Sequence, residues 1–255
     1  MSSLKSRLQS GDHLVGALVR MPCEEVVEML AVAGMDFVLI DCEHGPADTL
    51  ALRSHIALAQ VHGVPVLVRP GEREPATILR ALDHGAQGIV APHIDSAQEA
   101  RDLVGAAHYP PVGHRGFATY PRAGRFGTVS ADAHRAAAVE TLVVAMLESP
   151  GAATRSAEIL GVPGIDGYLI GVADLAASTG AQDPSFAESV AAIHRGAAEV
   201  GSWRAELAGS EEDAERVLDA GARLVVYNVA QVLMRVFAGL GTVSRPPAAA
   251  SRSTR

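Results

Sequence analysis

The chain has 255 residues, which fits one (β/α)8 barrel of about 250 residues. Hydrophobic residues make up 48% and charged residues 20%, a balance that excludes general disorder. The formal net charge of -8 disfavours nucleic acid and acidic membrane surfaces as partners. No apolar run approaches the ~20 residues of a membrane span. We therefore expect a cytoplasmic protein that acts on a small molecule.

Short runs rich in Val, Ile and Leu alternate with stretches of helical periodicity, as in parallel strands joined by crossover helices. Strands are predicted near residues 14–19, 36–41, 64–69, 88–92, 141–147, 167–171, 202–207 and 223–228, with the weakest pattern at 202–207. Helices are predicted near 23–33, 47–62, 74–84, 96–107, 151–160, 185–200, 211–220 and 229–239. This alternation predicts a single (β/α)8 TIM barrel over residues 1–242.

Glycine follows three of the predicted helices, at Gly34, Gly85 and Gly221, and each glycine precedes an apolar strand. Glycine relieves the left-handed turn that ends a helix. These loops therefore mark the structural end of the barrel, away from the reactive one.

Two segments fall outside the alternation. Residues 109–130 form a long connection rich in Pro, Gly and Arg, and such loops are functional or disordered. Its Arg115, Arg122 and Arg125 could close over an anionic substrate, contact another subunit, or stay solvated. The tail, residues 243–255, has low complexity and is predicted to be disordered.

Lys5 is the only lysine among the 21 basic residues, and it precedes the first predicted strand. A Schiff-base mechanism requires a lysine amine in a desolvated pocket. The sequence therefore offers almost no candidate for covalent imine chemistry.

Polar residues follow the carboxyl ends of the predicted strands, where barrel enzymes carry their reactive groups. They are Asp41-Cys42-Glu43-His44-Gly45, Arg69, Pro92-His93, Glu148-Ser149, Gly171 with Asp174, and Asn228. Glu148 and Asp174 end consecutive strands, so they should approach each other, and two carboxylates suit Mg²⁺, Mn²⁺ or Co²⁺. Each could instead cap the helix that follows it. Position alone leaves both interpretations open.

His44 is a candidate general base, because it follows two acids that could orient its ring, or else an ordinary loop histidine. Arg69 could hold a carboxylate or an oxygen that develops negative charge, or form a structural ion pair across the mouth. Asp83 falls on the structural side of the barrel, where the chain alone suggests no catalytic role.

Several motifs occur together in one order over residues 4–240. They are Asp36-Phe37-x-x-x-Asp41-x-Glu43-His44-Gly45, Val68-Arg69, Leu82-Asp83-x-Gly85-Ala86, Tyr109-Pro110-Pro111-x-Gly113-x-Arg115-Gly116, Glu148-Ser149 and Gly171-x-x-Asp174-Leu175. In this order they resemble the HpcH/HpaI aldolase family, the class II, metal-dependent pyruvate aldolases. The resemblance implies reversible cleavage of a 4-hydroxy-2-oxo acid to pyruvate and an aldehyde, through a metal-stabilised pyruvate enolate.

The resemblance also implies the roles of single residues. Glu148 and Asp174 become ligands of a divalent metal (Mg, Mn or Co), and His44 becomes the base-side residue held by Asp41. Arg69 becomes the group that stabilises the pyruvate oxygens.

Further implications concern the substrate and the assembly. Gly171 and Ala173 are expected to bind the substrate together with Asp174 and Arg69. The chain is expected to form a homo-oligomer, a trimer or a trimer-based hexamer, in which Asp83 approaches a neighbouring subunit's active site.

Three features depart from the family pattern. Met146 stands where many relatives have glutamine, Val172 replaces a common proline, and residues 201–207 lack the usual glycine-rich apolar strand. Met146 and the altered strand raise the alternative of an oxo-acid-binding barrel that no longer turns over. Another alternative is a lyase acting on an acyl-CoA of the malyl- or citramalyl-CoA type, although the acidic charge argues against a basic nucleotide groove.

Overall fold

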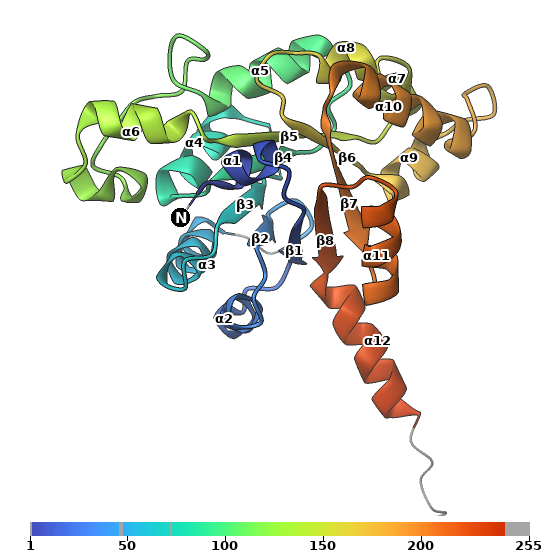
Figure 1. The fold of residues 1–255 in the computed structure, drawn as a ribbon, viewed down its shortest axis with the longest axis horizontal. Helices are drawn as coiled ribbons and strands as arrows, with labels where there is room; N and C mark the ends of the chain where they lie inside the picture. Colours follow the sequence, from blue (N-terminus) through green and yellow to red (C-terminus); the bar gives the residue numbers. More distant parts are fainter. Residues whose placement is uncertain (1, 46–47, 72, 243–255) are drawn as a thin grey trace, which may run out of the picture.

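The structure is a computed structural model that describes residues 2–45, 48–71 and 73–242. Eight parallel strands close in sequence order into one barrel, with helices around them (Figure 1), which confirms the (β/α)8 prediction. The strands are β1 (Leu14–Val19), β2 (Phe37–Asp41), β3 (Val66–Arg69), β4 (Gly88–Ala91), β5 (Leu142–Leu147), β6 (Gly167–Ile170), β7 (Trp203–Ala208) and β8 (Leu224–Asn228). The predicted disordered tail, 243–255, lies outside the described residues.

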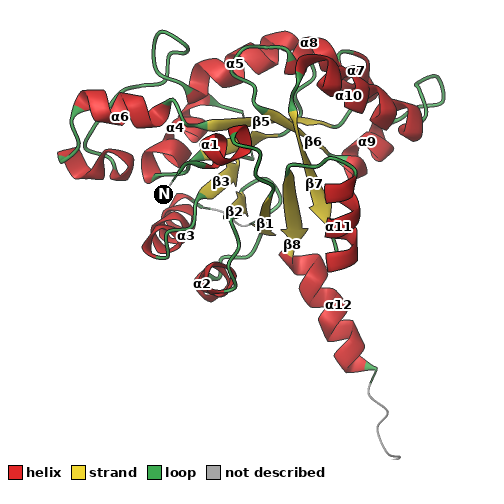
Figure 2. Cartoon of the chain, viewed as in Figure 1, coloured by secondary structure: helices red, strands yellow, loops and turns green. Residues whose placement is uncertain are grey.

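The helices surround the strands, as Figure 2 shows by colour. They are α1 (Leu4–Gln9), α2 (Glu24–Val32), α3 (Thr49–Val61), α4 (Pro75–His84), α5 (Ala97–Ala107), the 3-10 helix η1 (Arg122–Gly127), α6 (Ala131–Ala138), α7 (Pro150–Thr154), α8 (Ser156–Leu160), α9 (Val172–Ser178), α10 (Phe186–Val200), α11 (Glu211–Asp219) and α12 (Val229–Gly241). Within the part of the chain described, no helix is both long and apolar enough to cross a membrane.

The weakly patterned strand at 202–207 is present as β7, and its composition has a structural reason. Ala205 belongs to the barrel interior, so the residues on either side of it face the surrounding helices. These two residues, Arg204 and Glu206, form an ion pair with each other. An ion pair on the outer face of β7 therefore stands where most barrel strands have apolar side chains, and this is why the strand is weak in the sequence pattern.

Other elements differ from the prediction in detail. The helix predicted at 151–160 is two short helices, α7 and α8, which meet at Arg155. The helices α1, α6 and α9 were not predicted, because each has eight residues or fewer and shows little periodicity. Gly34, Gly85 and Gly221 have φ values of 86°, 106° and 93°, which confirms the predicted left-handed turns.

The amino-terminal end of the barrel is closed by α1. Its Leu4 and Leu8 are fully buried in the cluster that fills the barrel interior, together with Phe37. Lys5 on the same helix pairs with Asp166 at 2.8 Å, just before β6 begins. The single lysine therefore lies at the end of the barrel opposite to the strands' carboxyl ends.

Gly16 makes room for the largest side chain of this interior layer. It is in register with Phe37 on the neighbouring strand, and a Cβ at this position would lie 2.6 Å from three Phe37 ring atoms. Glycine is therefore required here by packing.

We expect Gly16→Ala to lower the free energy of unfolding by about 1–3 kcal/mol, because the added methyl group overpacks the barrel. Urea denaturation measures this. Gly239→Ala in α12 is the matched control, since its Cβ would meet nothing within 4 Å, and it should leave stability unchanged or raise it by up to about 1 kcal/mol. Equal effects of the two substitutions would contradict the packing argument.

Candidate active site

The carboxyl ends of the strands carry a layer of charged side chains directly above the apolar interior. Four inward-facing residues of that interior are each followed two positions later by a charged residue: Arg20, Asp41, Arg69 and Glu148. Because side chains alternate between the two faces of a strand, these four also point inward. They form the floor of the barrel mouth.

Asp41 and Arg69 form a buried ion pair in this floor. They are in register on β2 and β3, and Arg69 donates from Nε to Oδ1 at 2.8 Å and from Nη2 to Oδ2 at 2.5 Å. Arg20 Nε lies 3.1 Å from the same Oδ2. Burial alone would raise the pKa of Asp41, but the hydrogen bonds and charge of Arg69 outweigh burial and hold that pKa below its ordinary value.

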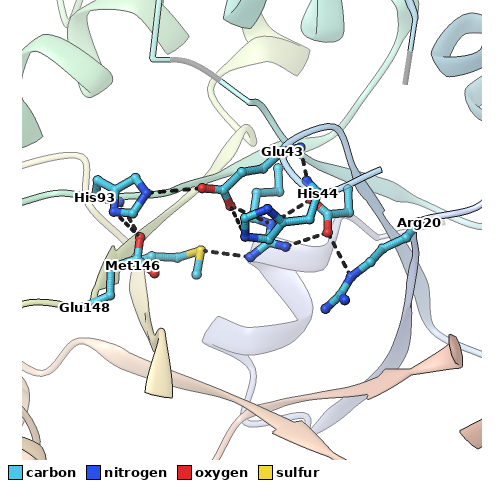
Figure 3. Close-up of polar contacts among 8 residues, drawn as sticks. Arg20, Glu43, His44, His93, Met146 and Glu148 are labelled. Atoms are coloured by element: carbon cyan, nitrogen blue, oxygen red, sulfur yellow. Dashed lines mark hydrogen bonds and ion pairs between the residues drawn. The ribbon is translucent and has the colours of Figure 1, made fainter. Parts of the chain in front are cut away.

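A second row of contacts crosses the mouth above this pair, as Figure 3 shows. Glu43 Oε2 lies 3.2 Å from Arg69 Nε, and Glu43 Oε1 lies 3.2 Å from His93 Nε2. His93 then reaches Glu148, with Nδ1 3.0 Å from Oε1 and a backbone N–H that donates to Oε1 at 2.6 Å. The loops after β2 and β4 are thus joined to the end of β5.

Glu148 is buried, and its other oxygen is directed toward α9. A Cβ on Gly171 would lie 2.0 Å from Oε2, so a side chain there would displace the carboxylate. Burial raises the pKa of Glu148, the charges of Glu43 and Asp174 add to the rise, and His93 opposes it. Asp174 lies exposed in the first turn of α9, close enough for its charge to raise the pKa of Glu148.

Neither carboxylate makes a side-chain N-cap hydrogen bond, although Asp174 lies in the first turn of α9, where the helix dipole favours an acid. Ser149, not Glu148, caps α7 with its hydroxyl, which accepts from the N–H of Ala152 at 3.0 Å. The N-cap of α9 is Gly171, and no side chain caps that helix.

The chemistry of Glu148 and Asp174 fits a hard divalent cation. Carboxylate oxygens are preferred ligands of Mg²⁺ and Mn²⁺. Within residues 2–45, 48–71 and 73–242, no cluster of three or more His, Cys, Asp or Glu side chains forms a complete metal cage. A cation between Glu148 and Asp174 would therefore keep positions open for water and substrate.

Comparison with known proteins agrees with this arrangement. The sequence profile of the HpcH/HpaI aldolase/citrate lyase family matches residues 21–234. The chain belongs to this family. It is 38% identical over 194 residues to a pyruvate aldolase of Rhizobium etli, covering 76% of each chain. It is 35% identical over 241 residues to a hydroxypyruvate/pyruvate aldolase of Sagittula stellata, covering 92% and 94%.

The fold agrees as well. A crystal structure of an HpcH/HpaI aldolase/citrate lyase family protein from Burkholderia cenocepacia has a TM-score of 0.85 and 30% identity, covering 93% of this chain and 96% of the other. The family resemblance predicted from the motifs is confirmed.

The structure shows how the two acids before His44 in this HpcH/HpaI family member contact that residue. Asp41 accepts from the backbone N–H of His44 at 3.3 Å, while the His44 ring lies near Glu43, with Nε2 3.8 Å from Oε2. Asp41 also binds two arginines, Arg69 and Arg20. Asp41 therefore positions the His44 backbone, and Glu43 is the acid beside its half-exposed imidazole.

Asp83 lies away from the mouth, near the end of α4. It pairs with Arg115 at 2.7 Å, and the Arg115 guanidinium lies 4.6 Å from the centre of the Tyr109 ring. Arg115 is buried, so the expectation of a solvated or substrate-closing arginine is wrong for this residue. Arg122 donates to Gln60 Oε1 at 2.8 Å, which ties the long connection to α3.

His93, which sequence reasoning left without a role, joins the site, as does Arg20, which was not considered. The signal for Arg20 was its position two residues after an inward-facing leucine. Of the departures from the family pattern, Val172 opens α9 at a position where proline is also favoured. Met146 places Sδ 3.8 Å from Arg69 Nη1.

We expect Asp41→Asn to lower the free energy of unfolding by about 3 kcal/mol, because it leaves Arg69 buried beside a neutral partner. In the wild type this contribution is present above the unfolded pKa of aspartate, about 3.9, and is lost as the pH falls through the lowered pKa of Asp41. The variant should lack that part of the acid sensitivity. Denaturant titrations between pH 7 and 3 measure both effects.

Asp213→Asn provides the control, since it removes an exposed pair with Arg216 of similar length, 2.9 Å. It should change stability little. An Asp41→Asn variant as stable as this control at pH 7 would show that the buried pair does not organise the mouth.

Proposed function

We propose that this protein is a metal-dependent aldolase that reversibly cleaves a 4-hydroxy-2-oxo acid to pyruvate and an aldehyde. The observation that carries this proposal is the placement of Glu148. Its buried carboxylate lies against Gly171, at the start of the helix that carries Asp174, and the charges of Asp174 and Arg69 interact with it. The relatives named as pyruvate aldolases support pyruvate as one product.

Glu148 and Asp174 are the residues that would hold the cation, which we assign as Mg²⁺, Mn²⁺ or Co²⁺. When bound, the cation supplies Lewis acidity toward the keto and carboxylate oxygens of the 2-oxo acid. Gly171 and Ala173, at the start of α9, border this position and bring backbone rather than bulky side chains to the substrate.

Arg69 stabilises the negative charge that develops on the substrate's keto oxygen. Asp41 holds its Nε and Nη2, while Nη1 faces the Met146 thioether, a weak acceptor, at 3.8 Å. A substrate oxygen is a better acceptor, so it can displace that contact. The guanidinium is preorganised by its partners before the substrate arrives.

His44 is the group that we assign to remove the proton of the C4 hydroxyl, with Glu43 beside its ring. The O–H electron pair then forms the aldehyde carbonyl, and the C3–C4 pair forms the enolate of pyruvate. Protonation at C3 completes the cleavage. Addition of the enolate to an aldehyde is the same sequence in reverse.

A homo-oligomer, a trimer or a hexamer, is the second part of the proposal. Figure 1 shows α12 projecting from the barrel, and four of its large apolar side chains are more than half exposed: Met234, Val236, Phe237 and Leu240. Contiguous apolar surface of this kind marks protein interfaces. In such an assembly Asp83, which is remote from the mouth of its own chain and paired with Arg115, would approach a neighbouring active site.

We expect Glu148→Gln to lower the rate of pyruvate release about a thousandfold, because the neutral amide holds a cation poorly. A lactate dehydrogenase coupled assay with a 4-hydroxy-2-oxo acid measures this. In the wild type, a chelator should abolish release, and Mn²⁺, Co²⁺ or Mg²⁺ should restore it.

Glu140→Gln is the matched control, because Glu140 bonds to Ser3 and Ser6 at the closed end of the barrel. It should keep full activity. Undiminished turnover in chelator would refute the metal-dependent mechanism. Cleavage of malyl-CoA in place of the oxo acid would favour the acyl-CoA alternative.

We expect the double substitution of Met234 and Phe237 by serine to reduce the oligomeric state, because it removes apolar surface from α12. Light scattering after size exclusion measures the mass. Val61→Ser, an exposed apolar position on α3, serves as the comparison. A wild type that is monomeric at micromolar concentration would contradict this part of the proposal.

A further inference from the structure

We propose that His93 is a positioning residue that holds Glu148 ready for the cation and links it to the Arg69 side of the mouth. This inference rests on the proposed metal site. It assigns a role to a histidine that the catalytic steps above do not use.

The first observation is a double contact on one oxygen of Glu148. The backbone N–H of His93 donates to Oε1 at 2.6 Å, and its ring Nδ1 lies 3.0 Å from the same atom. The opposite oxygen, Oε2, faces Gly171 and the start of α9. His93 therefore fixes the carboxylate from behind and leaves the oxygen toward Asp174 free. A partner of this kind orients a metal ligand without binding the metal.

The second observation is the backbone conformation of His93. Its φ is 54°, in the left-handed region, which only a few per cent of non-glycine residues adopt and in which Asn, Asp and His are the most frequent of them. Among the described non-glycine residues, Arg125 and Phe126 also have positive φ, but both lie in η1. At His93 the unusual φ occurs at a strand end, with the N–H directed at Glu148. Uncommon backbone conformations of this kind cluster at functional sites.

The third observation is the other side of the ring. Nε2 of His93 lies 3.2 Å from Glu43 Oε1, and the remaining oxygen of Glu43 lies 3.2 Å from Arg69 Nε. The imidazole thus separates two carboxylates that would otherwise repel each other. Through Glu43 the ring also connects Glu148 to Arg69 in one chain of contacts. This chain restrains the positions of both side chains.

The ring has two arms, the contact of Nδ1 with Glu148 and the contact of Nε2 with Glu43, and two substitutions separate them. Asparagine places its amide nitrogen near the position of Nδ1 and tolerates a positive φ, so His93→Asn keeps the arm to Glu148. Glutamine reaches about as far as Nε2, so His93→Gln keeps the arm to Glu43 and loses the ring contact with Glu148. His93→Ala removes both arms.

The test is Mn²⁺ affinity of the metal-free protein without substrate, measured by electron paramagnetic resonance of free Mn²⁺. We expect His93→Asn to bind within about threefold of the wild type. His93→Gln and His93→Ala should bind about tenfold more weakly, the usual effect of losing such a partner. Glu43→Gln should weaken binding no more than His93→Asn does, by up to about threefold, and should have no added effect on His93→Ala, because the link passes through the ring.

His62→Ala is the matched control, since His62 Nε2 also lies 3.2 Å from a carboxylate, that of Glu28, far from the mouth. It should not change Mn²⁺ affinity, and thermal melting checks that every variant is folded. If the wild type binds Mn²⁺ and His93→Gln and His93→Ala bind equally well, the inference is overturned while the metal site stands. If the wild type binds no Mn²⁺, or Glu148→Gln binds it equally well, both proposals fail.

Discussion

The buried pair of Asp41 and Arg69 is the interaction on which the mouth of this barrel depends. Its geometry follows from register, because the two residues face each other on adjacent strands at the height where the apolar interior ends. A charge at this depth is tolerated only with a partner. Once paired, Asp41 has oxygens left for the N–H groups of Glu43 and His44, so the same carboxylate that holds the arginine also shapes the loop carrying the base.

The charges above this pair do not balance. Two arginines, Arg20 and Arg69, face four carboxylates, those of Asp41, Glu43, Glu148 and Asp174. The arginines are engaged on the side of Asp41 and Glu43, which leaves the excess negative charge beside Glu148. Burial raises the pKa of that carboxyl, the charges of Glu43 and Asp174 add to the rise, and His93 opposes it. A divalent cation held as we propose would reduce the excess of negative charge and would supply the Lewis acid of the aldol reaction.

The sequence predicts those parts of this arrangement that follow from alternation along a strand. Asp41, Arg69 and Glu148 could be found because each ends an apolar run. The sequence signal of β7 was weak because an ion pair takes the place of apolar side chains on its outer face. The ring contacts of His93 depend on a positive φ and on loops that meet only in space. The sequence could not tell which of the two acids lies beside the His44 ring, because proximity in sequence does not reveal that arginines from the loop after β1 and from β3 bind the carboxylate of Asp41.

The two ends of the barrel differ in what they carry: the amino-terminal end carries packing and structural ion pairs, and the other end carries the charged mouth. At the amino-terminal end α1 closes the interior, and the only lysine is held by Asp166, so no amine is available at the mouth. Asp83 belongs to that same end, because it lies in the last turn of the helix that leads into β4 and is held there by Arg115. An acid so placed cannot serve the mouth of its own chain. Any contribution it makes to the reaction has to cross an interface, which ties the catalytic role implied for Asp83 to assembly.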